Sequence, residues 1–475
     1  MAALDAGGRL LAIERAAYPM RADPGTGAME QDPATWLDAL DRAVRALGAR
    51  TPLGRVRAVG LTGQMPTMVA LARGVPIGPA VTWMDGRADA FVDETLTPAR
   101  RAAIYRATGM PVDGRYIGPM YAFHVAAQGR RADLVLSAKD YVYLHLTGEA
   151  WTDPSTAAGF AALRLDGSDW DRRLLARWQL VTAQLPRLAP ADAAPAALRD
   201  SLADAWGVAR GAAVHVGAAD SVAAVLGAGG LADGCVTLVP GSSTVVMASV
   251  DAPRPDRRRR FLVTPHALPG RFGLEMDLLA SGASIGWLAA LCGTGEDELV
   301  GAAAAVPVGA LGLRFAPYLA GGEQGALWDP ALSGAVLGLR LGHRSAHLMR
   351  ALLEGLAMEV RRCLDALTEA DVPVRELLVA GGEPGAPPVL EGILADVAGL
   401  ALTRVAIESA AAVGAALLTG ATAVDPADAG AIRALHAQVT TRLAPTAERT
   451  DLYRSLYREH LAAFPRSARP ARGAR

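Results

Sequence analysis

Lysine is almost missing from this chain of 475 residues, because only one of its 47 lysines and arginines, Lys139, is a lysine. A P-loop nucleotide site needs a lysine within the pattern GxxxxGK[ST]. Lys139 stands in the sequence Ser-Ala-Lys-Asp, which lacks that glycine frame. The shortage of lysine therefore excludes a P-loop. A Rossmann dinucleotide site is also poorly supported, because no GxGxxG follows a predicted strand and opens a helix.

Cysteine is scarce as well. The three cysteines, Cys235, Cys292 and Cys363, lie far apart and form no CxxC motif. This spacing argues against a disulfide framework or a zinc site and is typical of reduced core thiols. We also find no pattern of a signal peptide and no apolar run long enough to span a bilayer. We therefore expect a cytoplasmic protein without a membrane partner.

Charge of one sign is not in excess, since 47 basic and 48 acidic residues leave a formal net charge of −1. We therefore expect no nucleic-acid partner, and we interpret Arg257–Arg260 as a solvated loop. His343 and His347 have the i, i+4 spacing of metal ligands, but neither a zincin glutamate nor a third ligand accompanies them. We expect no protein-held metal at these histidines.

Strand-like and helix-like patterns alternate through most of the chain, which favours an α/β class in which helices cover sheets. A chain of this length can form two or three domains, and we place a boundary near residues 222–232. The Pro/Ala-rich stretch Pro186–Ala197 indicates a surface connection. The predicted strands and hairpins cover Ala2–Tyr18, Val56–Leu61, Ala213–Val216, Cys235–Val250, Glu376–Val379 and Leu402–Ile407, and the predicted helices cover Pro33–Leu47, Ser221–Gly227, Ala346–Leu367, Pro387–Gly399, Ser409–Leu418 and Asp451–Phe464.

Three short segments could carry chemistry. Gly241-Ser242-Ser243 lies inside a predicted hairpin, and Gly381-Gly382 lies between a predicted strand and helix. Backbone N–H groups at such glycines can hold phosphate, but each segment is also an ordinary turn or tight connection. Asp220 follows a predicted strand and opens an alanine-rich helix. It could be an N-cap or a general base at a domain boundary.

Short motifs follow one another along nearly the whole chain. Gly63-Gln64-Met65 resembles SGQMHG, and Trp83-Met84-Asp85-Gly86-Arg87 resembles WNDQR. The further matches are Ala138–Tyr141 with Leu146–Asp153 (PKDYLRYRLTGE and TD), Val216–Asp220 (VVAGGGDN), Val239–Val245 (SLGTSG), Pro317–Pro330 (PYLxGERxPxWDP), Gly334–Glu354 (a C-terminal signature) and Gly381–Asp396 (an adenosine motif). In this order the motifs resemble the FGGY carbohydrate kinases, with most similarity to xylulokinase, and the first two would lie on the sugar side.

This resemblance implies two actin-like (ribonuclease H-like) domains, residues 1–222 for the sugar and residues 223–475 for ATP, with both ligands in the interdomain cleft. In that family pattern Asp220 takes the proton from a sugar hydroxyl that attacks the γ-phosphate, with ATP and Mg²⁺ as cofactors. Trp83 could instead pack in a core, and Arg87 could form a surface ion pair. The implied substrate-binding residues are Gln64, Met65, Trp83, Asp85, Arg87 and Asp220, and the implied ATP-binding residues are Gly241, Ser242, Ser243, Gly381 and Gly382.

The chain departs from the family pattern at several positions. The family's first strand and phosphate loop, GIDxGTxSxK, has no counterpart, because Met1–Asp5 aligns with the strand after it. Either the start codon is mis-assigned or this is a degenerate kinase, and we expect little or no turnover from a chain that begins at Met1. Pro66 replaces a histidine, Ser221 an asparagine, and Glu383 a glycine.

These departures leave the substrate open. The first hypothesis is phosphorylation of D-xylulose to D-xylulose 5-phosphate. The alternatives are ribulose, glycerol or another polyol as substrate, or a catalytically impaired protein that binds sugar. A homodimer is a further hypothesis.

Overall fold

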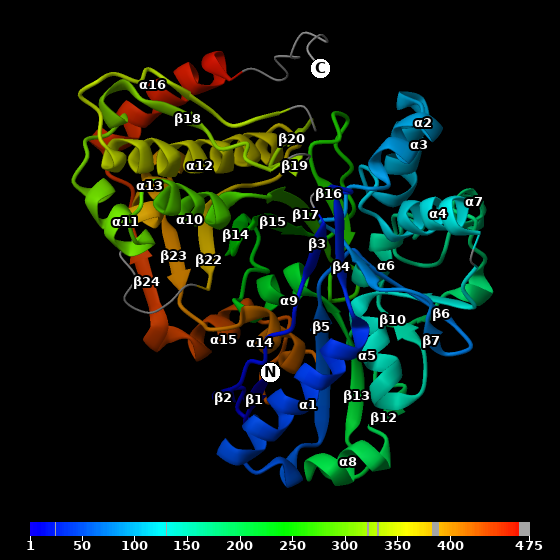
Figure 1. Ribbon diagram of the computed structural model, residues 1–475. Coiled ribbons are helices and arrows are strands. Elements are labelled where there is room, and N and C mark those ends of the chain that lie inside the picture. The colour runs from blue at the N-terminus through cyan, green and yellow to red at the C-terminus, as the bar shows by residue number, and fades with distance from the viewer. Residues whose placement is uncertain (24, 130, 321–322, 330–331, 382–388, 465–475) are drawn as a thin grey trace. The chain divides into compact units, whose positions relative to one another are not determined.

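The computed structural model describes residues 1–23, 25–129, 131–320, 323–329, 332–381 and 389–464 (Figure 1). These residues form two compact units. The first unit consists of Met1–Gly229, Val250–Gly273 and Ser409–Leu435, and the second of Gly230–Ser249, Leu274–Glu408 and His436–Arg475.

The predicted domain ranges, 1–222 and 223–475, are contiguous, whereas the compact units are not. Helix packing is the physical reason. Helix α14 (Ala410–Leu417) packs against α9 (Asp220–Gly227) and β5 (Ala58–Gly63), so this late segment belongs with the first unit. The approach is close, because a Cβ on Gly414 would lie 1.9 Å from the carbonyl oxygen of Ala223.

The first unit is built around the parallel pair of β5 and β13 (Ala213–Ala219), with β12 (Ala196–Ala197) on the other edge of β13. Its other strands are β1 (Ala2–Leu4), β2 (Leu10–Ile13), β3 (Arg21–Asp23), β4 (Ala28–Gln31), β6 (Thr67–Ala72), β7 (Val75–Pro76), β8 (Ala80–Thr82), β9 (Leu134–Leu136), β10 (Trp151–Thr152), β11 (Arg187–Leu188) and β16 (Leu262–Pro265). Its other helices are α1 (Pro33–Arg50), η1 (Leu53–Arg55), α2 (Asp89–Thr95), α3 (Pro98–Thr108), α4 (Ile117–Gln128), α5 (Ala138–Thr147), α6 (Pro154–Ala157), η2 (Ala158–Phe160), α7 (Arg172–Arg177), η3 (Thr182–Gln184), α8 (Asp200–Trp206) and α15 (Ala429–Leu435).

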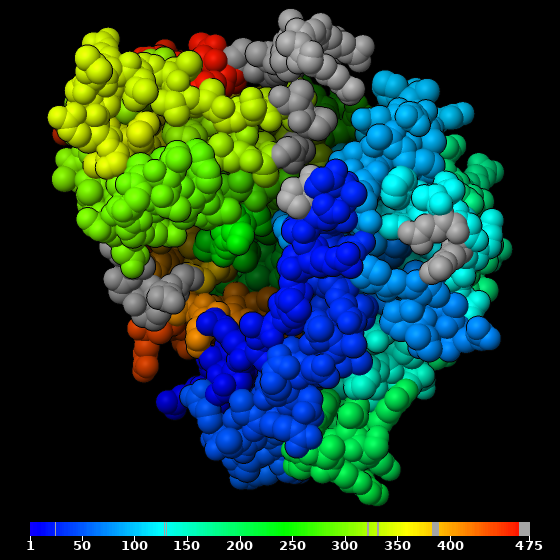
Figure 2. All heavy atoms as spheres, in the orientation of Figure 1, coloured from blue at the N-terminus to red at the C-terminus, as the bar shows by residue number. Residues whose placement is uncertain are grey.

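The N-terminal hairpin forms as its pattern predicts, since β1 and β2 pair antiparallel around a turn at Gly7-Gly8. A second sheet has the strand order β3-β4-β8-β6-β7. Strand β3 is exposed along its whole length, and the N-terminal segment, in dark blue, lies at the surface in Figure 2. The predicted surface connection Pro186–Ala197 contains the two short strands β11 and β12.

The second unit contains most of a nine-stranded sheet whose central order is β17-β15-β14-β22-β23-β24. Its strands are β14 (Cys235–Pro240), β15 (Thr244–Val250), β17 (Phe272–Leu278), β18 (Arg314–Ala316), β19 (Glu323–Gln324), β20 (Leu327–Trp328), β21 (Ala335–Leu337), β22 (Glu376–Ala380), β23 (Leu402–Val405) and β24 (Thr440–Leu443). Its helices are α10 (Ser281–Leu291), α11 (Glu296–Ala304), η4 (Ala310–Gly312), α12 (Ser345–Thr368), α13 (Val389–Ala398), η5 (Ala437–Val439) and α16 (Ala447–Ala463).

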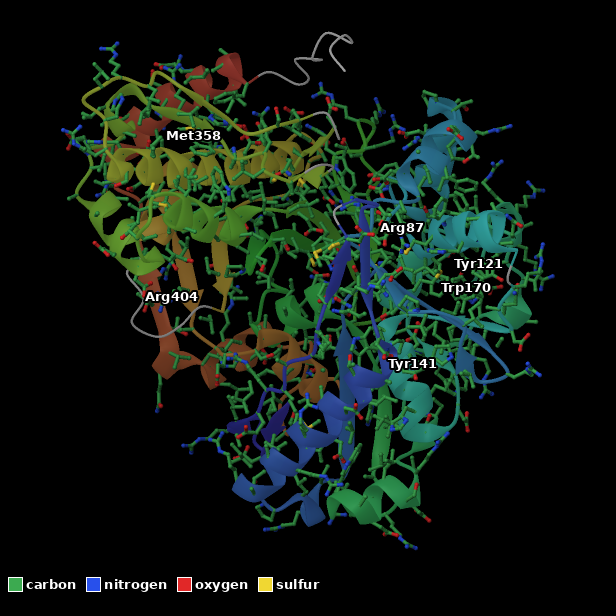
Figure 3. The ribbon with its side chains drawn as sticks, viewed as in Figure 1. Arg87, Tyr121, Tyr141, Trp170, Met358 and Arg404 are labelled. Carbon is green, nitrogen blue, oxygen red and sulfur yellow. The ribbon has the colours of Figure 1, made fainter. Side chains whose placement is uncertain are left out.

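The amphipathic stripe predicted over Ala346–Leu367 is confirmed, because α12 spans Ser345–Thr368 and buries its apolar positions. Helix α12 packs against α10, α11 and α13. Figure 3 places Met358 on α12 and Arg404 on β23. The helix predicted from Pro387 is described from Val389, and Pro387 itself lies outside the described residues, as does the tail from residue 465.

Two smaller expectations can be compared with the structure. Arg257 and Arg258 are exposed, as expected for a solvated loop, but Arg260 is buried. Its Nε donates to Asp256 Oδ2 at 2.8 Å, so the run ends in an ion pair that the arginine pattern alone did not indicate. Among the described residues, no three His, Cys, Asp or Glu side chains are grouped to hold a metal ion. No described helix is long and apolar enough to cross a membrane.

Candidate active site

Asp220 is the first residue of α9 and directly follows the carboxyl end of β13. The N-cap position belongs to Ala219, and Asp220 Oδ1 accepts a hydrogen bond from the backbone N–H of Ser221 at 2.9 Å. The side chain is open to solvent, yet desolvation by the surrounding protein raises the pKa of Asp220 to about 6, against a smaller opposing effect of the Ser221 N–H. An accessible carboxylate that titrates near neutral pH has the properties of a general base.

The segment after β5 emerges beside Asp220. Strands β5 and β13 are parallel, and Gly63 pairs with Ala219. Because parallel strands end at the same edge of a sheet, Gln64 and Asp220 leave that edge side by side. Gln64 Nε2 donates a hydrogen bond to Gln31 Oε1 at 3.0 Å, which fixes the amide. The sugar-side motif and the candidate base therefore meet through strand pairing alone.

Met65 and Trp83 are both partly buried. Met65 lies against η2, where a Cβ on Gly159 would be 2.7 Å from the methionine Sδ. A glycine at that position therefore makes room for Met65. Trp83 follows β8 directly and is partly exposed, so it is not a fully buried core residue.

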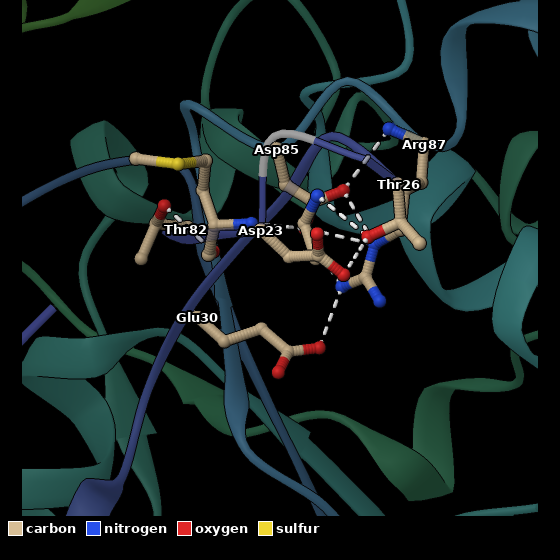
Figure 4. A network of polar contacts seen from close by, with 8 residues as sticks. Asp23, Thr26, Glu30, Thr82, Asp85 and Arg87 are labelled. Carbon is tan, nitrogen blue, oxygen red and sulfur yellow. Dashed lines mark hydrogen bonds and ion pairs between the residues drawn. The ribbon is translucent and has the colours of Figure 1, made fainter. Parts of the chain in front are cut away.

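Arg87 forms an ion-pair cluster with Asp85 and Glu30 (Figure 4). Arg87 Nη2 lies 2.7 Å from Asp85 Oδ2 and 2.8 Å from Glu30 Oε1. Arg87 Nε donates to both oxygens of Asp85 at 3.0 Å. Because the Asp85 side chain is only 2% exposed and that of Arg87 20% exposed, this pair is largely buried and is not the surface ion pair of the alternative interpretation.

The carboxylate of Asp85 has little capacity left for a sugar hydroxyl. It also accepts hydrogen bonds from the backbone N–H groups of Met29 at 2.9 Å and Arg87 at 3.0 Å. A carboxylate offers about four lone-pair sites, and these contacts occupy them. The geometry therefore gives Asp85 the task of orienting Arg87 and the β4 strand, a different task from the direct sugar contact that the motif implied.

Three residues near these groups were not among the predicted site residues. Glu30 and Gln31 belong to β4, and Tyr18 precedes β3. Burial, together with the negative charge of Asp220, raises the pKa of Tyr18, so this phenol lies within electrostatic reach of the candidate base. The turn-rich sequence Asp23–Gly27 could have pointed to Glu30 and Gln31, because it predicts a hairpin whose second strand is β4.

In the second unit, Gly241 and Ser242 are exposed at the tip of the β14–β15 hairpin. The N-terminus of α10 lies against this tip, since a Cβ on Gly282 would be 2.2 Å from the carbonyl oxygen of Gly241. The backbone N–H of Ala283 donates to Ser242 O at 3.1 Å. An exposed turn beside the N-terminus of an 11-residue helix offers backbone N–H groups to phosphate, and one N–H group of that helix end, that of Ala283, is already used to hold the turn.

Gly381 follows β22, which is the parallel neighbour of β14 with Leu238 opposite Val379. The turn of Gly241 and the end of β22 therefore share one edge of the sheet. Gly381 has φ of +118°, a conformation that favours glycine, and its N–H donates to Val405 O at 2.9 Å. Gly382 lies outside the described residues.

The sequence itself matches a known family over most of its length. Residues 1–227 match the N-terminal domain of the FGGY family of carbohydrate kinases, and residues 236–423 match its C-terminal domain. The chain belongs to this family. It is therefore a sugar kinase, a phosphotransferase with an alcohol group as acceptor, and the predicted α/β fold with two actin-like (ribonuclease H-like) domains is confirmed.

Several relatives share this architecture. The chain is 31% identical to the xylulose kinase of Klebsiella pneumoniae over 413 residues, covering 84% of this chain and 83% of that protein. It is 25% identical to the gluconokinase of Bacillus subtilis over 395 residues, covering 79% and 76%. Among solved structures, the xylulose kinase of Rhodospirillum rubrum has a TM-score of 0.81 at 26% identity and covers 96% of this chain and 92% of that one.

Proposed function

We propose that this FGGY kinase transfers the γ-phosphoryl group of ATP to a hydroxyl of a neutral ketose, with D-xylulose as the first candidate and Asp220 as the base. One observation carries the assignment of the base. The pairing of Gly63 with Ala219 brings Gln64 and Asp220 to the same strand edge. The choice of xylulose is supported by the xylulose kinases among the relatives that are 31% identical to this chain.

The charge of the sugar side argues for a neutral substrate. The cluster of Arg87 with Asp85 and Glu30 contains one cation and two carboxylates, which gives a net charge of −1, and Asp220 adds a further negative charge when it is ionised. Gluconate carries a carboxylate of its own, which this field would repel. A gluconate substrate is therefore disfavoured, although gluconokinases are among the relatives.

The proposed reaction asks little covalent chemistry of the protein. Ionised Asp220 accepts the proton of the substrate hydroxyl as its oxygen attacks phosphorus, and positioning contributes most of the remaining rate. In the second unit, the backbone N–H groups around Gly241, Ser242 and Ser243 would bind phosphate oxygens, assisted by the N-terminus of α10. The absence of a side chain at Gly282 lets α10 approach the turn, because a Cβ there would lie 2.2 Å from Gly241 O.

Mg²⁺ supplies charge neutralisation of the transferring phosphates when it is bound. Mg²⁺ usually retains waters and binds through one or two carboxylates plus substrate phosphates. The described residues contain no group of three metal-ligating side chains. The phosphates of ATP and water would therefore be the main ligands of Mg²⁺. Asp220 acts as the base in this proposal and is not assigned to the metal.

A substrate panel tests the proposal. Release of ADP from ATP is measured with D-xylulose, D-ribulose, glycerol and gluconate, together with sugar binding by calorimetry. We expect the highest kcat/KM with D-xylulose. Faster turnover of gluconate would contradict the charge argument, and sugar binding without ADP release from any substrate would favour the impaired sugar-binding protein.

Two variants test the base. Asp220→Asn should lower kcat by about 10²- to 10⁴-fold, the usual contribution of a general base. Asp200→Asn is the matched control, because Asp200 is also the first residue of a helix, α8, and its side chain is 68% exposed. Retention of wild-type kcat by Asp220→Asn would refute the assignment.

A further inference from the structure

Lys139, the only lysine of the chain, has a buried ammonium group with three acceptors around it. Lys139 Nζ donates to Asp140 Oδ1 and to the carbonyl oxygen of Val216, both at 2.9 Å, and lies 3.3 Å from Asp153 Oδ1. Two of the three ammonium donors form hydrogen bonds, and the contact with Asp153 Oδ1 is an ion pair without hydrogen-bond geometry. The two carboxylates are stabilised in turn, since Asp140 closes the capping box of α5 and Asp153 is the N-cap of α6.

The contact with Val216 occurs where β13 is irregular. The register of β13 against β5 shifts between His215 and Ala218. Within the shift, Gly217 has φ of +74°, and a Cβ there would lie 1.7 Å from Leu61 O. A bulge leaves backbone groups without ladder partners. The ammonium of Lys139 satisfies the Val216 carbonyl, which is buried and would otherwise be costly to leave unpaired.

A second branch of the same network reaches the residue before Asp220. Asp153 Oδ2 accepts hydrogen bonds from the N–H of Ser155 at 2.9 Å and from its hydroxyl. Ser155 Oγ in turn accepts a hydrogen bond from Ala219 N at 2.9 Å. The network therefore holds β13 at Val216 directly and at Ala219 through two side chains.

Lys139 also supports the neighbouring strand. A Cβ on Gly63, at the end of β5, would lie 3.1 Å from Lys139 Cβ. One lysine thus contacts the ends of both strands that lead to Gln64 and Asp220.

We propose that Lys139, Asp153 and Ser155 form a positioning network that fixes the bulged end of β13 and so sets the carboxylate of Asp220 relative to the sugar-binding segment. This inference rests on the proposed role of Asp220 as the base. None of the three side chains is assigned a contact with substrate; they act through backbone groups of Val216 and Ala219.

The choice of lysine at this position follows from geometry. Wherever else this chain has a lysine or an arginine, the residue is arginine. A guanidinium is a planar fork, whereas an ammonium is a compact point charge with three rotatable donors. The two carboxylates and one carbonyl around Lys139 meet at one nitrogen, an arrangement that the ammonium matches and the guanidinium does not.

Ser155→Ala is the sharpest test, because it removes the bridge to Ala219 and leaves the ion pairs intact. We expect kcat to fall by about ten- to a hundredfold, the effect of a slightly misplaced reacting group, while KM for the sugar stays close to its wild-type value. Hydrogen exchange of the Ala219 amide should become faster. Thr156→Val is the matched control, since Thr156 is equally buried on α6 and its hydroxyl has no hydrogen-bond partner.

Lys139→Met leaves two buried carboxylates without their cation, a change that destabilises the fold, so it is interpreted only together with Ser155→Ala. Folding of Lys139→Met is monitored by tryptophan fluorescence, because this variant contains no lysine that could be labelled. Equal kcat in Ser155→Ala and Thr156→Val, with unchanged exchange at Ala219, would overturn the proposal even if wild-type turnover confirms the kinase. Absence of wild-type turnover would instead count against the proposed function, and the exchange measurement would still decide whether Ser155 anchors Ala219.

Discussion

Asp220→Asn should increase the free energy of unfolding relative to wild type at pH 8, and this difference should be much smaller at pH 4. Desolvation raises the pKa of Asp220 from 3.8 to about 6, so between these values the folded state binds more protons than the unfolded state. The free energy of unfolding therefore decreases as the pH rises through this window. Above it, the folded wild type carries an ionised carboxylate in an unfavourable environment, and the asparagine variant does not.

The size of the effect follows from the shift. A change of about two pKa units corresponds to about 3 kcal/mol. Because Asp220 is open to solvent, screening reduces this figure, and we expect about 1 kcal/mol. Loss of a negative charge at the N-terminus of α9 acts in the opposite direction by about 0.3–1 kcal/mol.

Urea unfolding at pH 8 and pH 4 separates these contributions. Wild type, Asp220→Asn and Asp200→Asn are compared by tryptophan fluorescence, and the Asp200 variant reports the loss of a helix-end charge together with that of an exposed ion pair to Arg210 at 3.9 Å. After that correction, Asp220→Asn should be more stable than wild type by about 1 kcal/mol at pH 8 and close to wild type at pH 4. The same difference at both pH values would refute the reasoning.

Three further substitutions give distinct expectations. Gly217→Ala should destabilise the protein by about 3 kcal/mol, because φ of +74° and a contact of 1.7 Å oppose any Cβ there, whereas Gly211→Ala, at φ of +79° in open space, should cost about 1 kcal/mol in the same urea experiment. Arg87→Met should cost about 3 kcal/mol, because it leaves a buried carboxylate without its cation; a stability equal to wild type would contradict the cluster geometry. Gly282→Ala should raise KM for ATP and leave KM for the sugar unchanged, since its Cβ would lie 2.2 Å from the phosphate turn, and Gly286→Ala on the same helix, 3.3 Å from a flexible carboxylate, is the control.

Local sequence patterns predicted the elements whose formation depends on residues close in sequence. The stripe of α12 and the hairpin around Gly241–Ser243 were found close to their observed bounds, because periodicity and turn residues act over short distances. The helix at Asp220 was found for the same reason.

Features that depend on distant partners were missed. Glu30 joins Arg87 only because β4 pairs with β8, and this pairing is not visible in either segment. Arg260 is buried because Asp256 lies beside it, which a run of arginines does not indicate. The hydrogen bonds that Asp85 accepts were also not visible, since the motif gives the residue but not its partners.

The burial of Lys139 has a practical consequence for handling the protein. Its side-chain nitrogen is the only lysine amine in the chain, and the side chain is 1% exposed. Amine-directed cross-linkers and lysine-specific proteases therefore find no lysine target while α5 remains packed on β13. Cleavage or modification at Lys139 would therefore report opening of the first unit around α5, and amine labelling at the exposed N-terminal amine of Met1 would serve as the accessible reference.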